Sequence, residues 1–417
     1  MLDRRDFTAL LGAAFLPGVA HAAGETLGFY ASVGPRLTLY RLDRRAASLT
    51  QSGSITLPAN LQYAWPHPSQ KFLYVAASNS QPGSGPMGAV GADKNHYALA
   101  FKIDPSTGAL TPHGERRLLP VRPVHLTTDR TGAFLFIAYN NPSQVTAHRL
   151  NKDGSIGEQV AQAASPDFGI YAHQVRVTPG GLTLTLCSRG NDATASKPED
   201  PGRIEVLSVK DGQISNLQTV TVGNGLGFGP RHLDFHPNGR LVYVSLEREN
   251  SIAVFGLKAD GTMTQEPLFL KSALTDPLAK EKHPGQTVGP IHVHPGGRLV
   301  YQTNRGSGTV EVEGRKVSNG GENNVVVWAI DPATGEPNLI QRAEAHGFEL
   351  RTFSIDPAGR MLIAASTTPM LLRDGSTVSA GLSVYRIGSD GKLDFVRKVD
   401  VDTSAGIQFW CGTLNMP

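Results

Sequence analysis

Short hydrophobic runs, each preceded by a tight turn, recur along the chain. Six segments join a Pro, Gly, Asp or Asn turn to β-branched and aromatic residues: HPSQKFLYVA (67–76), TDRTGAFLFIAY (128–139), TPGGLTLTLCSR (178–189), HPNGRLVYVSLE (236–247), HPGGRLVYQTNR (294–305) and DPAGRMLIAAST (356–367). Turns of this composition join antiparallel strands closely. The pattern predicts six β-hairpins, and no long window has the spacing of an amphipathic helix.

A second hairpin pattern follows each of these segments, in AFKIDPSTGAL, AHRLNKDGSIG, EVLSVKDGQIS, AVFGLKADGTM, VVWAIDPATGE and SVYRIGSDGKL. One more copy, TLYRLDRRAASL, precedes them all. The repeat is about 50 to 60 residues long, which accommodates the four strands of a propeller blade. Seven copies of the second hairpin predict an all-β propeller with seven blades.

The first repeat lacks an opening strand, and the C-terminal segment 405–411 forms a strand with no partner of its own. This C-terminal strand can supply the innermost strand of the first blade. Such pairing closes the ring and leaves no exposed sheet edge. An open β-solenoid explains the repeat less well, because it gives the last strand no role.

Composition agrees with many short strands joined by turns, with 46 Gly and 28 Pro among 417 residues. Polar stretches at 80–95, 190–203, 275–288 and 306–324 are interpreted as loops on the propeller faces, so residues 23–417 are expected to form one domain. The net charge of +3 is too weak to indicate a nucleic-acid or membrane-surface partner. Cys187 and Cys411 lie in apolar strands and are interpreted as buried thiols rather than as a disulfide.

The N-terminus has the features of a cleaved export signal in residues 1–22. Arg4-Arg5-Asp6-Phe7 resembles a twin-arginine signal, an apolar stretch follows, and Ala20-His21-Ala22 has the small residues of a cleavage site. The apolar stretch is too short to span a bilayer, and no other segment is apolar enough to do so. We therefore expect export by the twin-arginine machinery to the periplasm or the medium. The alternative is an amphipathic N-terminus without a targeting role.

Strand order within a blade predicts where functional side chains gather. If strands A to D run from the axis to the rim, the start of A and the end of B lie on the same face. His173, Arg231 and Arg351 occupy equivalent positions before the A–B turn. The expected site residues are His173, Arg231, His232, His292 and Arg351 at the starts of A strands, and Arg189, Glu247, Asn304 and Arg305 at the ends of B strands.

These residue types point to an anion site at one mouth of the central channel. Arginines hold a carboxylate or phosphate through forked hydrogen bonds and can stabilise an oxyanion. Glu247 and His173 are the candidate proton-transfer groups. His292 could equally be a channel ligand or a packed core residue, whereas the His-Pro residues His67, His236 and His294 belong to turns on the opposite face. No nucleophile elbow, phosphate loop or metal motif is present, so no metal or other cofactor is expected.

Five segments resemble the bacterial 6-phosphogluconolactonase family of seven-bladed propellers, which includes the 3-carboxy-cis,cis-muconate cyclases. They are PVHLTTDRTGAFLFIAYN (123–140), YAHQVRVTP (171–179), GFGPRHLDFHPNGRLVYVSLE (227–247), GPIHVHPGGRLVYQTNR (289–305) and LRTFSIDPAGRMLIAAS (350–366). The resemblance implies a channel-mouth site formed by His173, Arg231, Glu247 and Arg305. An export signal is unusual for an enzyme with a cytosolic phosphorylated substrate, so an unphosphorylated lactone is a further possibility.

Together the sequence predicts a lactonase that opens an anionic sugar-acid lactone. Glu247 or His173 activates water, and Arg231, with Arg305 and Arg351, holds the anionic group and stabilises the oxyanion. The expected substrate-binding residues are Arg305, Arg351, His232, Asn304 and His292. Two alternatives remain open: a carboxymuconate-type cycloisomerase that clamps a diacid with the same arginines, and a non-catalytic exported propeller that binds an anion. Fold resemblance does not choose among them.

Overall fold

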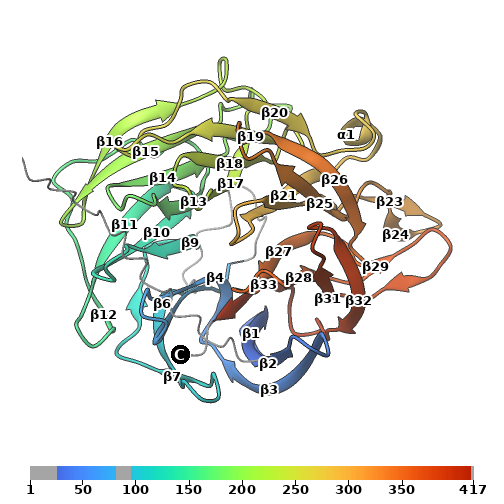
Figure 1. Cartoon of the computed structure of the whole chain (residues 1–417), viewed down its shortest axis with the longest axis horizontal. Helices are drawn as coiled ribbons and strands as arrows, with labels where there is room; N and C mark the ends of the chain where they lie inside the picture. The colour runs from blue at the N-terminus through green and yellow to red at the C-terminus, as the bar shows by residue number, and fades with distance from the viewer. Residues whose placement is uncertain (1–25, 81–94, 415–417) are drawn as a thin grey trace, which may run out of the picture.

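The computed structural model describes residues 26–80 and 95–414, in which seven sheets of four or five strands are arranged in a ring as blades (Figure 1). The first blades along the chain comprise β4 (Asn60–Pro66), β5 (Phe72–Ser78), β6 (His96–Ile103) and β7 (Leu110–Pro112) in blade 2, β9 (Pro123–Thr128), β10 (Phe134–Asn140), β11 (Ser143–Leu150) and β12 (Ile156–Gln159) in blade 3, and β13 (Ala172–Val177), β14 (Thr183–Ser188), β15 (Arg203–Lys210) and β16 (Gln213–Val220) in blade 4. A two-residue strand, β8 (Arg117–Leu118), also pairs with β6.

The remaining consecutive blades follow the same antiparallel order. They comprise β17 (Pro230–Phe235), β18 (Leu241–Leu246), β19 (Ser251–Gly256) and β20 (Phe269–Ser272) in blade 5, β21 (Gln286–Val293), β22 (Leu299–Gly306), β25 (Asn324–Ile330) and β26 (Pro337–Glu344) in blade 6, and β27 (Leu350–Ile355), β28 (Met361–Ser366), β31 (Gly381–Ile387) and β32 (Leu393–Asp400) in blade 7.

Blade 1 joins the two ends of the described chain, as the sequence predicts. Its strands are β33 (Gln408–Leu414), β1 (Thr26–Val33), β2 (Arg36–Asp43) and β3 (Ser48–Thr56), with β33 innermost and β1 beside it. The register pairs Gly28 with Leu414 and Ala31 with Cys411. Because β33 also contacts β4 and β27, the ring of inner strands is closed. The expected signal at residues 1–22 lies outside the described part of the chain.

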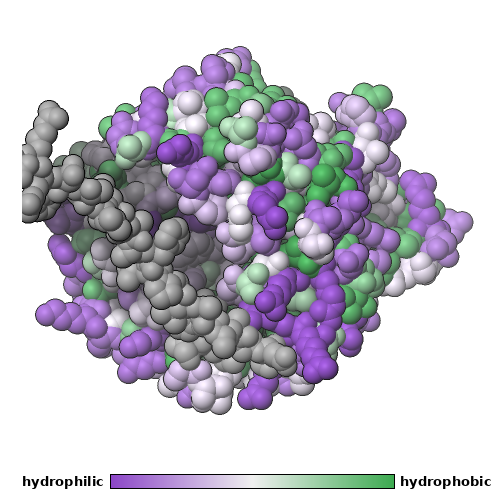
Figure 2. Space-filling model, in the orientation of Figure 1, coloured by the Kyte–Doolittle hydropathy of each residue, from purple (hydrophilic) through white to green (hydrophobic). Residues whose placement is uncertain are grey.

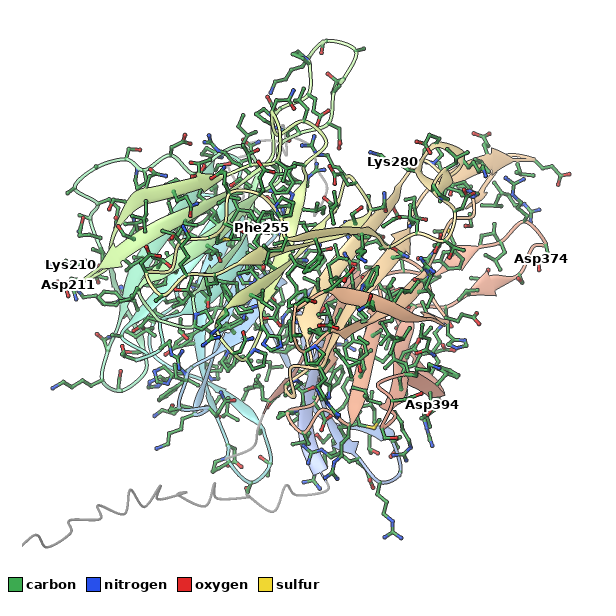
Figure 3. The ribbon with its side chains drawn as sticks, turned by 45° about the horizontal axis from the view of Figure 1, so that its top comes forward. Lys210, Asp211, Phe255, Lys280, Asp374 and Asp394 are labelled. Atoms are coloured by element: carbon green, nitrogen blue, oxygen red, sulfur yellow. The ribbon has the colours of Figure 1, made fainter. Side chains whose placement is uncertain are left out.

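The B strands are hydrophobic on both faces because a neighbouring blade covers each face. All six residues of β28, MLIAAS, are buried, whereas the outermost strand β3 is mostly exposed or half-buried. Seven hydrophobic clusters result, one between each pair of adjacent blades. Figure 3 shows Phe255 inside the strands and Lys210, Asp211, Lys280 and Asp374 at the edges. The surface in Figure 2 is largely hydrophilic at its rim, with hydrophobic residues in small groups.

A repeated set of hydrogen bonds joins adjacent blades at the end of the ring that carries the A–B and C–D turns, here called the turn end. Tyr74, Tyr243 and Tyr301 each donate from a B strand to the carbonyl of a glycine in the C–D turn of the next blade, at 2.9 Å. The His-Pro residues His236 and His294 bond the A–B turn of the next blade in the same way, through Gly297 O at 2.7 Å and Gly359 O at 2.9 Å. These contacts fix the angle between neighbouring blades.

The long connections expected as loops hold some secondary structure of their own. Segment 306–324 contains a hairpin of β23 (Thr309–Val312) and β24 (Arg315–Ser318), and segment 275–288 contains α1 (Ala279–Lys282) and the start of β21. A further short hairpin, β29 (Met370–Leu371) with β30 (Thr377–Val378), lies between β28 and β31. In the described ranges no helix is long and apolar enough to cross a membrane.

Candidate active site

Each of the seven inner strands carries an irregularity relative to its partner strand, at the end away from the turn. Such a bulge interrupts strand pairing and redirects a side chain. In five blades the extra residue is a single position: Gln62, Val124, His173, Arg231 and Arg351. Blades 6 and 1 have a similar irregularity between Val288 and Ile291 and between Gln408 and Cys411. The bulges turn side chains from successive blades toward the channel mouth.

The bulged residues line a cavity of about 210 Å³ at this end of the channel, here called the mouth cavity. Most of the residues expected from the sequence meet there: His173, Arg189, Arg231, His232, Glu247, Arg305 and Arg351. Blades 4, 5, 6 and 7 supply them, from A-strand bulges and B-strand ends. The cavity therefore combines one carboxylate, two imidazoles and several guanidinium groups from distant parts of the chain.

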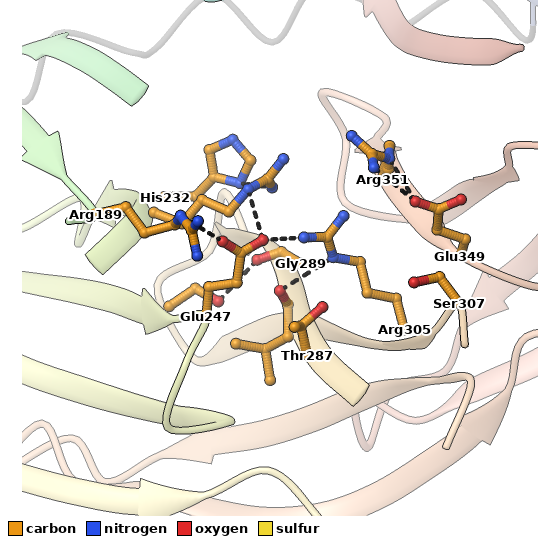
Figure 4. Close-up of polar contacts among 12 residues, drawn as sticks. Arg189, His232, Glu247, Thr287, Gly289, Arg305, Ser307, Glu349 and Arg351 are labelled. Atoms are coloured by element: carbon orange, nitrogen blue, oxygen red, sulfur yellow. Dashed lines mark hydrogen bonds and ion pairs between the residues drawn. The ribbon is translucent and has the colours of Figure 1, made fainter. Parts of the chain in front are cut away.

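Glu247 lies at the centre of this arrangement and contacts three arginines (Figure 4). Its Oε1 pairs with Arg305 Nη2 and lies 3.1 Å from Arg231 Nε, while its Oε2 lies 3.3 Å from Arg189 Nε. Arg305 is also held by the hydrogen bond from its Nε to Val288 O, at 3.2 Å. Because Glu247, Arg231 and Arg305 are each only 6–7% exposed, water screens these pairs weakly.

The arginines keep Glu247 ionised. Burial by itself raises the pKa of the Glu247 carboxyl. The guanidinium groups of Arg231, Arg305 and Arg189 overcome this effect, and its pKa falls to about 2. Burial also lowers the pKa of Arg231, to about 9, which leaves it cationic at neutral pH. A carboxylate with so low a pKa is a weak base, so its role here is to fix the guanidinium groups.

The two histidines of the cavity are held in the neutral form. Burial, with Arg231 close by, lowers the pKa of His173 and of His232 well below 6.5. Arg231 Nη1 lies 3.1 Å from His232 Nδ1 and donates to it, so the proton of this imidazole is on Nε2. His173 packs edge-on against His232, with ring centroids 4.9 Å apart, and its buried Nδ1 has no partner among the described residues. A neutral imidazole at the cavity wall can accept a proton.

At the irregular position of its inner strand, blade 6 carries a glycine, Gly289, where other blades carry a larger side chain. A Cβ at Gly289 would lie 2.4 Å from Thr303 Oγ1 and 2.8 Å from Leu350 O, so only glycine fits there. The same Cβ would lie 3.4 Å from Arg305 Cδ. Glycine at this bulge therefore lets the backbone of blade 6 pack closely against Thr303 and Leu350, next to the Arg305 side chain.

Arg351 belongs to the same cavity but pairs with a different carboxylate. Its Nε donates to Glu349 Oε1 at 2.8 Å, and its Nη2 lies 2.7 Å from the same oxygen. Thr367 Oγ1 donates to the other oxygen of Glu349 at 2.9 Å. The guanidinium also lies 5.7 Å from the ring centroid of Phe409, so it is fixed from two sides.

Two residues expected at the mouth lie elsewhere. Asn304 is fully buried, and its Nδ2 donates to Ala273 O at 2.9 Å, because neighbouring residues of a strand point to opposite faces and Arg305 takes the cavity side. His292 lines a second cavity, of about 230 Å³, nearer the turn end. There its Nδ1 lies 3.7 Å from Asp234 Oδ2 and its ring packs edge-on against Phe353. His292 stands closer to its turn along the strand than Arg231 does to its own, which accounts for the displacement.

Comparison with known proteins identifies the family. The profile described as "Lactonase, 7-bladed beta-propeller" matches residues 26–373. The chain belongs to this lactonase family. A 6-phosphogluconolactonase of Erwinia tasmaniensis is 24% identical over 355 residues, covering 84% of this chain and 88% of the relative. Another, from Enterobacter sp. (strain 638), is 27% identical over 331 residues, covering 79% and 84%.

Solved structures confirm the fold of this lactonase-family propeller. A periplasmic gluconolactonase from Pseudomonas aeruginosa superimposes with a TM-score of 0.71 at 19% identity, over 94% of this chain and 100% of the other. A protein from Lactobacillus plantarum gives 0.69 at 19% identity, over 93% and 99%. The family match and the curated relatives support the lactonase function predicted from the sequence.

The lactonase-family mouth cavity also contains residues that the sequence reasoning missed. They are Gln62, Tyr63, Arg122, Val124, Asn140, Tyr171, Thr287, Thr352, Phe409 and Trp410. The sequence could have predicted that Gln62 lies at the mouth, because it stands at the same distance before its turn as His173, Arg231 and Arg351 do. For Arg122 the sequence offered only a weak indication: this residue directly precedes the Pro-Val-His that opens β9. Tyr63, Thr352 and Trp410 line both cavities and so lie between them.

The cysteines and the potential metal ligands of this lactonase-family chain form no second reactive site in the described ranges. Cys187 and Cys411 are free and buried, and burial raises the pKa of the Cys411 thiol to about 12. Within residues 26–80 and 95–414, no group of three or more His, Cys, Asp or Glu side chains is placed to hold a metal ion.

Proposed function

We propose that the chain hydrolyses the ester bond of a sugar-acid lactone in the mouth cavity. The observation that supports this most directly is the pairing of buried, ionised Glu247 with three guanidinium groups beside neutral His173. Guanidinium donors fixed before the substrate arrives stabilise charge that develops in the transition state. The lactone carbonyl oxygen lies against Arg231 and Arg305 in this proposal.

His173 is the general base that we propose. It takes a proton from water as the water oxygen bonds to the carbonyl carbon, and the carbonyl oxygen becomes an oxyanion held by Arg231 and Arg305. The ring C–O bond then breaks, and the proton on His173 passes to the departing ring oxygen. Glu247 acts as a positioning residue, because a carboxylate with a pKa of about 2 accepts protons poorly at neutral pH.

We also propose that the mature protein, residues 23–417, is a single domain that works outside the cytoplasm. The support is the sequence Arg4-Arg5-Asp6-Phe7 followed by an apolar stretch and Ala20-His21-Ala22. Export in the folded state by the twin-arginine machinery would supply the enzyme to lactones in the periplasm or the medium. The test is fractionation of cells that express either the intact leader or a leader with the double substitution Arg4→Lys and Arg5→Lys. Only the intact leader should deliver the protein to the periplasmic fraction.

The experiment that tests the activity is hydrolysis of gluconolactone and 6-phosphogluconolactone by the purified mature protein. Spontaneous ring opening makes a blank without enzyme necessary. We expect turnover above the blank that is lost in Arg231→Ala. The rate should also fall as pH drops through a value below 6.5, where His173 becomes protonated, and His173→Gln should abolish this acid limb. Rates equal to the blank on both lactones would leave the muconate-type cyclase and the anion-binding propeller as the candidate functions.

A further inference from the structure

Five arginines line the mouth cavity, and four of them have a carboxylate partner: Arg189, Arg231 and Arg305 contact Glu247, and Arg351 contacts Glu349. The fifth, Arg122, has none among the described residues. Its one side-chain hydrogen bond there runs from Nε to Gln62 Oε1, at 2.8 Å. Arg122 therefore differs in kind from the arginines that surround Glu247.

The Arg122 guanidinium is nevertheless held in place. Gln62 is 1% exposed, and its Nε2 donates to Asn60 O at 3.1 Å and to Ser78 O at 3.4 Å, which orients its oxygen toward Arg122. Pro123 follows Arg122 and restricts the backbone of the residue before it. The guanidinium is thus fixed through Nε, while its two terminal nitrogens make no hydrogen bond to a described residue.

The surroundings of Arg122 favour an anionic ligand. Burial lowers the pKa of Arg122 to about 10, and the nearby charge of Arg351 contributes to the same effect, yet the group remains cationic at neutral pH. Arg122 is half-buried, and a partly desolvated cation without a counter-charge is unfavourable, so a ligand anion reduces that penalty. Terminal guanidinium nitrogens bind the paired oxygens of a carboxylate or a phosphate.

We propose that Arg122, oriented by Gln62, is a specificity-determining residue that binds a second anionic group of the substrate, a carboxylate or a phosphate remote from the lactone ring. This inference rests on the proposed function, because it places the lactone ring at Arg231 and Arg305. It assigns separate tasks to the arginines: those on Glu247 act on the reacting ester, and Arg122 selects substrates that carry an additional charge.

The test is calorimetric binding of three sugar acids that differ in their second anionic group: gluconate, glucarate and 6-phosphogluconate. The protein should bind at least one of the two acids with a second anionic group more tightly than it binds gluconate. In Arg122→Met this preference should fall about 10- to 100-fold, because a hydrogen bond to a charged group is lost. Arg122→Lys should keep part of it, and Gln62→Glu should weaken it by pairing Arg122 internally. The acid with the larger loss identifies carboxylate or phosphate as the group recognised.

Arg116→Met is the matched control. Arg116 is exposed, stacks on Tyr97 and lies outside the mouth cavity, so its removal should leave the preference unchanged. Equal affinity of the unaltered protein for all three acids, binding of none of them, or an unchanged preference in a folded Arg122→Met would each overturn the inference. Turnover is measured separately, so a protein that opens no lactone but loses the preference in Arg122→Met contradicts the proposed function and supports the role of Arg122.

Discussion

The two ends of the propeller differ in how far the blades repeat one another. At the turn end the same contact recurs from blade to blade, as in the tyrosine-to-glycine bonds of Tyr74, Tyr243 and Tyr301. At the mouth the blades share a backbone bulge but carry different side chains on it, including Gln62, Val124 and Arg231. Repetition at one end sets the shape of the ring, and variation at the other sets its chemistry.

This contrast explains how a repeated fold carries one asymmetric site. The bulge supplies successive blades with a side chain aimed at the axis, so the same position is available many times over. Function then requires only that residue types differ at this position and at the neighbouring B-strand ends. Charged groups concentrate on blades 4 to 7, where Glu247 organises Arg189, Arg231 and Arg305.

The largest expected effect is on activity at the mouth. Glu247→Gln removes the charge that fixes three guanidinium groups, so kcat/KM for lactone hydrolysis should fall about 100- to 1,000-fold, the loss typical of disrupted transition-state electrostatics. Initial rates corrected for the blank measure it, with circular dichroism to show that the variant is folded. If the variant does not fold, Arg189→Gln, at the more exposed side of Glu247, provides a second test. Full activity in whichever of these variants folds would remove this cluster from the mechanism.

The next effect concerns stability in acid. The pKa of Glu247 is about 2 in the folded protein and 4.5 for the free side chain, so its ionisation stabilises the fold above pH 4.5 by about 3 kcal/mol. That contribution is lost progressively as pH falls from 4.5 to about 2. Urea unfolding between pH 5 and 2.5 should show the difference between the unaltered protein and Glu247→Gln shrinking as pH drops. A difference that stays constant with pH would contradict the assignment.

A smaller effect is expected at the turn end. Tyr243→Phe deletes the hydrogen bond to Gly335 O and leaves a buried carbonyl unpaired, which should cost about 1 to 2 kcal/mol of unfolding free energy. Lactone hydrolysis should stay within about twofold, because the residue lies far along the strand from the mouth cavity. Tyr97→Phe is the control, since the Tyr97 hydroxyl has no hydrogen bond in the described ranges. A large loss of activity in Tyr243→Phe would erase the distinction between the two ends.

The smallest effect is expected for an ion pair outside both ends. Arg117 and Glu158 lie 3.1 Å apart, but Glu158 is 85% exposed. Exposed pairs contribute little, so Glu158→Gln should change the free energy of unfolding by less than about 0.5 kcal/mol and leave activity unaltered. The same urea titrations measure it. A cost near that of Glu247→Gln would show that burial is not what distinguishes the mouth.

The ring itself was predictable from the sequence, because turn residues and β-branched runs recur about every 50 to 60 residues. Closure through the C-terminal strand followed from counting the hairpins, and the pairing of β33 with β1 confirms it. The hairpin in segment 306–324 was not predicted, since each of its strands is only four residues long and lies in a stretch rich in Gly and polar residues.

The site was predictable where a residue stands at the same distance before its A–B turn in several blades. His173, Arg231 and Arg351 stand the same number of residues before their turns, and all three line the mouth cavity. His292 stands fewer residues before its turn and lines the other cavity. Asn304 and Arg305 were expected on one side, although strand alternation allows only one of them to face the mouth. Arg122 lies in a connection rather than a strand, so its direction depends on tertiary packing that no local pattern contains.

The closing strand imposes an order on how the ring is completed. Blades 2 to 7 each consist of strands that follow one another along the chain, so each can assemble as soon as the ribosome has released it. Blade 1 must wait, because β1 pairs with β33, the last of the described strands to be synthesised. Phe409 and Trp410 of β33 also line the mouth cavity. A chain stopped short of β33 therefore lacks both a finished ring and a finished site, so the binding cavity appears only when translation has passed residue 414.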